Sequence, residues 1–85
     1  MADTFLLEVA TPERLMVREN VSEAQIPAKD GYLGILPGHA ALLSELGAGV
    51  LSYTADGRHR SLHIDGGWLE VSNDRARVLA TTAEE

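Results

Sequence analysis

Two of the three histidines in this sequence, His59 and His63, stand four residues apart and could in principle hold a metal ion. On a helix this spacing would place both imidazoles on one face. The residues around them read as a strand, however, and four residues of a strand span roughly 13 Å. That separation is too large for two ligands of one ion. We therefore expect solvent-exposed strand histidines here and no metal site.

Serine, histidine and aspartate are all present, so composition alone permits a hydrolase triad. No serine lies in a Gly-x-Ser-x-Gly elbow, and nothing in the sequence places an oxyanion hole beside one. Gly47-Ala48-Gly49 begins like a dinucleotide-binding loop but lacks the third glycine and the following helix. We predict a connection between strands at this segment, no catalytic residue and no cofactor.

Trp68 and His39 are the two single residues for which a structural and a functional interpretation compete. Trp68 follows Gly66-Gly67 and would be either a core or edge aromatic or an exposed anchor at a protein interface. The His39 ring would either bond backbone groups around the Pro37-Gly38 turn or contact a partner. Because no acid or base adjoins His39 in sequence, catalysis is the weakest of its possible roles.

The composition limits the classes of function that this chain can serve. Its 85 residues, taken as residues 1–85, form a single domain with one small core. The formal net charge of -6 argues against a partner that is nucleic acid or an anionic membrane. Cysteine is absent, and no apolar run reaches the roughly 18 residues of a membrane span. The N-terminus does not read as a signal peptide.

Short segments of alternating polar and apolar residues predict that the fold is all-β. Turn residues separate eight or nine such segments at intervals of roughly 8–12 residues, which is typical of an antiparallel β-sandwich or barrel. Breaks are expected at Thr11-Pro12-Glu13, Asp56-Gly57, Asp65-Gly66-Gly67 and Asn73-Asp74, with a polar tail from Thr81 to Glu85. The side chains expected to point inward are Phe5, Leu7, Val9, Ala24, Ile26, Leu62, Ile64, Leu69, Val71, Ala76, Val78 and Ala80.

The stretch from Asp30 to Leu43 organises the rest of the chain in this interpretation. It predicts a strand over Gly31 to Leu36, a sharp turn and then a second buried segment. Glycine permits φ > 0, and proline fixes φ near -65°, so such a turn would hold His39 in a fixed place at the surface. The residues assigned to this structural turn are Gly34, Pro37 and Gly38.

The same stretch resembles the signature D/E-G-x-x-G-[IV]-x-P-G-H-A of the epsilon subunit of F-type ATP synthases. Four further segments fall in the order expected for that family: Leu7–Glu13, Leu46–Leu51 (L-x-x-G-x-L), Gly66–Val71 (G-G-x-x-E-V) and Val78–Ala80 followed by Ala83-Glu84. The resemblance covers the whole chain. It implies an antiparallel β-sandwich of about ten short strands and a non-catalytic rotor subunit in the central stalk.

By position, the resemblance also implies two partner surfaces. Thr11, His39 and Ser44 match the region that faces the gamma subunit, while Lys29, Asp30, Gly31 and Tyr32 match the contact with the membrane c-ring. The domain would fasten gamma to the ring so that both turn together, and so couple ring rotation to ATP synthesis. It would lie at the cytoplasmic face of the bacterial inner membrane as a peripheral part of the complex, with no nucleic-acid partner and membrane contact only through that complex.

Two departures from the family pattern bear on this expectation. Ala41 stands where the family usually has proline, and this chain ends at Glu85, where members usually continue into a helical hairpin. That hairpin is associated with inhibition of ATP hydrolysis and, in some members, with ATP binding, and neither role is carried over here. The alternative is a free-standing β-sandwich module that binds a small ligand or carbohydrate with Trp68 as a stacking platform. A small hydrolase is the third class.

Overall fold

The computed structural model describes residues 3–85, which form eight strands and, within that range, no helix. All but one of the strand pairings are antiparallel, and the exception is the parallel pair of β1 and β8. The prediction of an all-β sandwich is confirmed. The structure has eight strands where the resemblance implied about ten, and one of the pairings is parallel. The strands are β1 (Phe5–Ala10), β2 (Leu15–Val21), β3 (Glu23–Ala28), β4 (Gly31–Ile35), β5 (Leu42–Glu45), β6 (Ala48–Ala55), β7 (Arg58–Ser72) and β8 (Arg75–Glu84).

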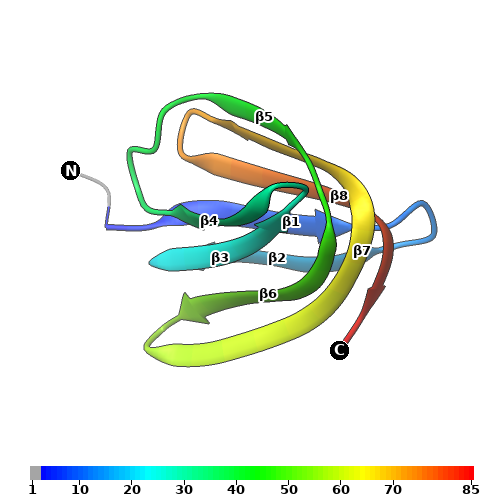
Figure 1. Cartoon of the computed structure of the whole chain (residues 1–85). Helices are drawn as coiled ribbons and strands as arrows, with labels where there is room; N and C mark the ends of the chain where they lie inside the picture. Colours follow the sequence, from blue (N-terminus) through cyan, green and yellow to red (C-terminus); the bar gives the residue numbers. More distant parts are fainter. Residues whose placement is uncertain (1–2) are drawn as a thin grey trace.

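One continuous sheet folds over on itself to make the two layers of a sandwich (Figure 1). Its strand order is β2-β1-β8-β7-β6-β3-β4, and β5 also pairs with β7. The first layer comprises β2, β1, the start of β8, the end of β7, and β5. The second layer comprises β4, β3, β6, the start of β7 and the end of β8.

The layers meet at a corner where β7 and β8 bend, on the side away from the N-terminus in Figure 1. The inward-facing side chains of β7 are Leu62 and Ile64 before the bend and Leu69 and Val71 after it, so the alternation changes phase at Gly66-Gly67. The ladder continues through the corner, because Leu46 N–H donates to the Gly67 carbonyl at 2.9 Å and Gly66 N–H to that of Gly47 at 3.2 Å. We refer to Leu46-Gly47, Gly66-Gly67 and Thr81-Thr82 as the corner.

The bend corrects two expectations from the sequence. Asp65-Gly66-Gly67 is not a break between two strands but a kink within β7, and Thr81 to Glu84 is not a tail but the end of β8, opposite Asp65 and its neighbours. Gly67 has φ of 112°, and a Cβ there would overlap the Leu79 carbonyl and lie 2.9 Å from the Ala80 Cα. Glycine is therefore required at the kink, where the backbones of the paired strands β7 and β8 approach closely.

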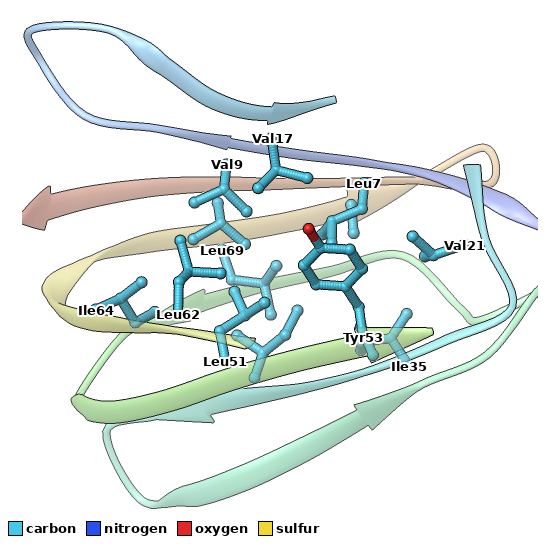
Figure 2. Close-up of a cluster of buried hydrophobic side chains, with 14 of the residues drawn as sticks. Leu7, Val9, Val17, Val21, Ile35, Leu51, Tyr53, Leu62, Ile64 and Leu69 are labelled. Carbon is cyan, nitrogen blue, oxygen red and sulfur yellow. The ribbon is translucent and has the colours of Figure 1, made fainter. Parts of the chain in front are cut away.

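The core lies between the layers and takes side chains from both (Figure 2). The predicted inward-facing residues of β1, β3, β7 and β8 are all buried, which confirms that part of the sequence analysis. Leu51, Tyr53 and Ala55 of β6 and Ile35 of β4 add to the second layer's contribution. Each fully buried Leu or Ile contributes about 1.5–3 kcal/mol to stability, so this cluster is what holds the two layers together.

Candidate interaction surfaces

The tip between β3 and β4 is an exposed turn that is tied to the corner. Lys29 N–H donates to the Glu45 carbonyl at 2.9 Å, and the Lys29 Nζ lies 3.8 Å from the Glu45 carboxylate. Tyr32 Oη accepts the Val50 N–H at 3.0 Å, at a point where β6 has separated from β3. Asp30 and Gly31 are exposed beside them. The four residues expected to face the c-ring therefore form one outward-pointing group on an anchored turn.

His39 lies in the loop between β4 and β5, at the opposite end of the molecule from the corner (Figure 1). Its backbone N–H donates to the Leu36 carbonyl at 3.1 Å, and the ring Nδ1 is 2.7 Å from the Ala40 carbonyl. The Gly38 N–H donates to Asp74 Oδ1 at 2.8 Å, which fastens the loop to the turn between β7 and β8. The ring thus bonds a backbone group of its own loop, as the structural interpretation expected, while remaining partly exposed.

Pro37 and Gly38 form the turn of this loop, and Gly38 has φ of 81°. Gly34 belongs elsewhere, because it lies inside β4 opposite Gln25. A Cβ at Gly34 would come within 3.1 Å of the Gln25 Nε2. The three residues assigned to one structural turn thus divide between a strand and a loop.

Thr11 and Ser44 lie nearer the corner than His39 does. Thr11 closes the turn between β1 and β2, where its Oγ1 accepts the N–H groups of Glu13 and Arg14 at 3.2 and 3.3 Å. Ser44 lies on β5 opposite Leu69 and donates to the Glu45 carbonyl at 3.2 Å. The three residues expected to face gamma are therefore not one cluster. Thr11 follows β1 and Ser44 lies on β5, and β8 and β7 separate these two strands, while His39 lies at the end away from the corner.

The outer face of the first layer carries a row of exposed apolar side chains next to the corner. Strand register places Leu15, Ala10, Leu79 and Trp68 side by side on four neighbouring strands. Trp68 is 51% exposed, Leu79 56% and Leu15 55%, so the exposed interpretation of Trp68 is the one that the structure supports. An open hollow of about 580 Å³ lies at this row, lined also by Thr11, Glu45 and Gly67. We call these four residues the apolar row.

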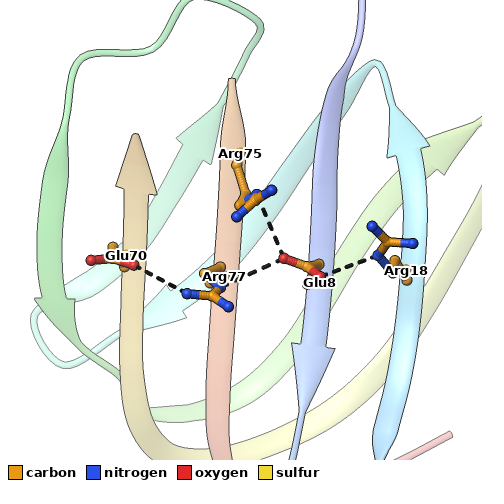
Figure 3. A network of polar contacts seen from close by, with 5 residues as sticks. All are labelled: Glu8, Arg18, Glu70, Arg75 and Arg77. Atoms are coloured by element: carbon orange, nitrogen blue, oxygen red, sulfur yellow. Dashed lines mark hydrogen bonds and ion pairs between the residues drawn. The ribbon is translucent and has the colours of Figure 1, made fainter. Parts of the chain in front are cut away.

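One step further along the same strands, charged side chains replace the apolar ones (Figure 3). Glu8 of β1 lies between Arg18 of β2 and Arg77 of β8, and Arg75 also lies close to it. The nearest distances to the Glu8 carboxylate are 3.3 Å from Arg18, 3.6 Å from Arg77 and 3.7 Å from Arg75, while Arg77 also lies 3.9 Å from Glu70. We call these five residues the arginine cluster.

The middle of the second layer's outer face carries small or uncharged side chains, with Glu23 and Glu84 in the rows on either side. Register places Gly34, Gln25, Ser52 and Ser61 in one row across four strands. His59 and His63 both face outward on this layer, and His59 Nδ1 lies 3.1 Å from Thr54 Oγ1. Among residues 3–85 no three His, Asp or Glu side chains are grouped so that they could hold a metal ion. The same part of the chain contains no helix capable of crossing a membrane.

The sequence analysis missed the apolar row and the arginine cluster as surfaces. The outward positions of Leu79, Arg75 and Arg77 follow from the alternation along β8. That Glu8 and Ala10 lie beside them does not follow from this alternation, because β1 and β8 come from opposite ends of the chain and pair in parallel. The available signal was the alternation along each strand. It shows which side chains point outward, but it does not show which strand lies next to which.

Comparison with known proteins gives one consistent family. The model of the ATP synthase, Delta/Epsilon chain, beta-sandwich domain matches residues 4–85. The chain is 58% identical over 84 residues to the ATP synthase epsilon chain of Solibacter usitatus, covering 99% of this chain and 63% of that one. It is 49% identical over 84 residues to that of Koribacter versatilis, covering 99% and 59%. The chain thus spans about three fifths of the length of these curated relatives.

Solved structures support the same fold. A chain of the mitochondrial ATP synthase of Euglena gracilis superimposes with a TM-score of 0.89 at 21% identity, covering 98% of this chain and 54% of that one. A chain from the central stalk and c-ring of the Tetrahymena thermophila mitochondrial ATP synthase gives 0.80 at 16% identity, covering 94% and 65%. From the match over residues 4–85, we conclude that this chain belongs to the beta-sandwich domain family of ATP synthase delta and epsilon chains.

Proposed function

We propose that this domain is a non-catalytic rotor subunit in the central stalk of an F-type, proton-translocating ATP synthase. It fastens the gamma subunit to the membrane c-ring and thereby couples ring rotation to ATP synthesis. The observation that carries the proposal is the family match over residues 4–85, supported by relatives named ATP synthase epsilon chain at up to 58% identity. These matches favour the subunit over a free-standing carbohydrate-binding module.

The architecture suits a part that transmits force. A closed core joins the two layers, and hydrogen bonds tie both the β3–β4 tip and the His39 loop to neighbouring strands. Interiors packed in this way have low compressibility and transmit strain. A torque applied at one surface of such a body therefore reaches another surface with little internal deformation.

We assign the gamma subunit to the outer face of the first layer and its borders, with Thr11 after β1, Ser44 on β5 and His39 in the β4–β5 loop. By our extension, this surface includes the apolar row. Large exposed apolar side chains such as Trp68 and Leu79 are typical of protein interfaces. The c-ring belongs at the tip formed by Lys29, Asp30, Gly31 and Tyr32. The domain then reaches the membrane only through the complex, at the cytoplasmic face of the bacterial inner membrane.

Binding to purified gamma tests the proposal directly. Trp68 is the only tryptophan in the sequence, so its fluorescence reports on the proposed gamma surface. We expect a spectral shift with gamma at micromolar concentrations and none with sugars. No shift and no retention of gamma in a pull-down at those concentrations would overturn the assignment, and a shift with sugar alone would favour the carbohydrate-binding module.

Charge reversal at the tip separates the ring contact from the gamma contact. Asp30→Lys should leave folding and gamma binding intact but reduce co-purification with the membrane-embedded ring, because Asp30 is exposed at the tip. Asp56→Lys is the matched control, since Asp56 is equally exposed but lies in the turn between β6 and β7. Equal ring recovery for both variants would contradict the placement of the ring at this tip.

A further inference from the structure

The arginine cluster has more cationic side chains than acidic ones to pair with them. Arg18, Arg75 and Arg77 share Glu8, and only Arg77 has a second acidic partner, Glu70. Three positive and two negative charges leave the cluster at +1, on a chain whose formal net charge is -6. The cluster therefore has the opposite sign to the molecule that carries it.

Glu8 is also incompletely bonded within the cluster. Its Oε2 accepts a hydrogen bond from Arg18 Nε at 3.3 Å, but its Oε1 is buried and has no hydrogen-bond partner. Arg77 and Arg75 approach Oε1 at 3.6 and 3.7 Å, which is beyond the range of a hydrogen bond. Two guanidinium groups thus compete for one oxygen, and neither reaches it. A second carboxylate that engaged one of them would free the other to close on Glu8.

The arginine side chains remain available to such a carboxylate. The side chains of Arg18, Arg77 and Arg75 are 60%, 50% and 49% exposed. Guanidinium groups present a planar fork of donors that matches a carboxylate in a bidentate geometry. The cluster lies on the same outer face as the apolar row, two residues along β7 and β8 from Trp68 and Leu79. The face therefore combines an apolar anchor with a neighbouring set of cationic donors.

We propose that the arginine cluster is a docking site for a carboxylate-bearing segment of the protein that covers this face. The partner's apolar side chains cover Trp68 and Leu79, and its Asp or Glu side chains accept hydrogen bonds from Arg75 and Arg77. This inference rests on the proposed function, which makes that partner the gamma subunit. Its basis is charge complementarity. The cationic patch attracts an acidic segment, whereas the acidic remainder of this chain would repel the same segment.

Salt dependence of gamma binding, measured with wild type and charge variants, tests the proposal. Wild type should bind at least about tenfold more weakly at an ionic strength of about 0.5 M than at about 0.05 M, because salt screens exposed charges. The double variant Arg75→Gln with Arg77→Gln should bind at least about tenfold more weakly than wild type at low salt and lose most of the salt dependence. Arg75→Lys with Arg77→Lys should keep the salt dependence and lose only part of the affinity.

The matched control is Arg58→Gln with Arg60→Gln, which removes two exposed arginines that are likewise two residues apart but lie on β7 in the second layer. It should bind gamma as wild type does. Affinity that is independent of salt, or Arg75 and Arg77 glutamine variants that bind like the control, would overturn this inference while leaving the rotor assignment standing. Failure of wild type to bind gamma at any salt concentration would instead overturn the proposed function and, with it, this inference.

Discussion

The two outer faces of the sandwich share β7 and β8 but differ in chemistry. The first layer presents the apolar row and the arginine cluster, whereas the second presents Gly34, Gln25, Ser52 and Ser61 across its middle. β7 contributes Trp68 to one face and Ser61 to the other. This difference is the reason for placing the proposed gamma contact on the first layer. The corner that divides β7 assigns its side chains to one face or the other.

The corner should therefore be the most sensitive position in the chain. In Gly67→Ala the new Cβ would collide with the Leu79 backbone, and φ of 112° would strain any residue with a side chain. We expect a loss of about 3 kcal/mol or more in the free energy of unfolding. Urea unfolding followed by circular dichroism measures it.

Gly57→Ala is the control for the glycine substitution itself. Gly57 has φ of 74° in the turn between β6 and β7, but a Cβ there meets nothing within 4 Å. Its cost should be about 1 kcal/mol from the left-handed conformation alone. If both alanine variants lost the same stability, close approach of β8 would not be the reason for glycine at the corner.

The same position shows how far the sequence determines the fold. Alternation identified the buried residues of β1, β3, β7 and β8 correctly, because a strand exposes and buries successive side chains wherever it pairs. The second buried segment expected after the Pro37-Gly38 turn was wrong for β5, which has no buried residue. Alternation does not distinguish a kink from a turn. Gly66-Gly67 permits both, and only the register with β8 and the bonds to Leu46 and Gly47 make it a kink. This is why Asp65-Gly66-Gly67 was expected to separate two strands.

The surfaces were predictable only in part, for a related physical reason. Local turn chemistry indicated the Lys29–Tyr32 tip and the Pro37-Gly38 turn, since the glycines there need φ > 0. The arginine cluster depends instead on β1 pairing with β8, a contact between the two ends of the chain. Spacing along the sequence contains no information about that pairing. Surfaces made by one turn could therefore be anticipated, whereas surfaces made across strands could not.

Truncating one apolar side chain on each face tests whether partner binding is confined to the first layer. Trp68→Ala should weaken gamma binding by about 2 kcal/mol, as expected for an aromatic anchor at an interface. Its effect on stability should stay within about 0.5 kcal/mol, since the side chain is 51% exposed. Titration calorimetry with gamma measures the loss.

Val50→Ala is the counterpart on the second layer, where Val50 is 37% exposed. We expect its gamma affinity to equal that of wild type. A loss as large as that of Trp68→Ala would mean that both faces contribute to binding, and the contrast between the layers would not hold.

A second crossing between the layers, the loop from β4 to β5, should tolerate change better than the corner. Gly38 has φ of 81° there, but a Cβ would meet nothing within 4 Å. Gly38→Val should therefore cost only about 1–2 kcal/mol from backbone strain, and it should weaken gamma binding by displacing His39. Thermal unfolding and gamma titration check both effects, and an unchanged melting temperature with unchanged assembly would refute the role given to this turn.

A polar contact between Tyr53 and Glu19 joins the layers from β6 to β2 and should make stability depend on pH. The Tyr53 hydroxyl donates to Glu19 Oε2 at 3.3 Å. Burial, together with the nearby Glu19 carboxylate, raises the pKa of Tyr53 above its ordinary value of 10.0. Above pH 10 the unfolded chain thus releases the Tyr53 proton while the folded chain still holds it, so the stability present below that pH should fall as pH rises. Urea unfolding at a series of pH values measures this slope.

Tyr53→Phe isolates the contribution of that proton. The variant keeps the buried ring but removes the ionisable group, so its stability should fall less steeply above pH 10 than that of wild type. Glu19→Gln should reduce the slope to a smaller degree, because it removes the negative charge but leaves Tyr53 buried. A slope that is the same in all three proteins would mean that neither the burial of Tyr53 nor its contact with Glu19 across the two layers links the ionisation of Tyr53 to stability.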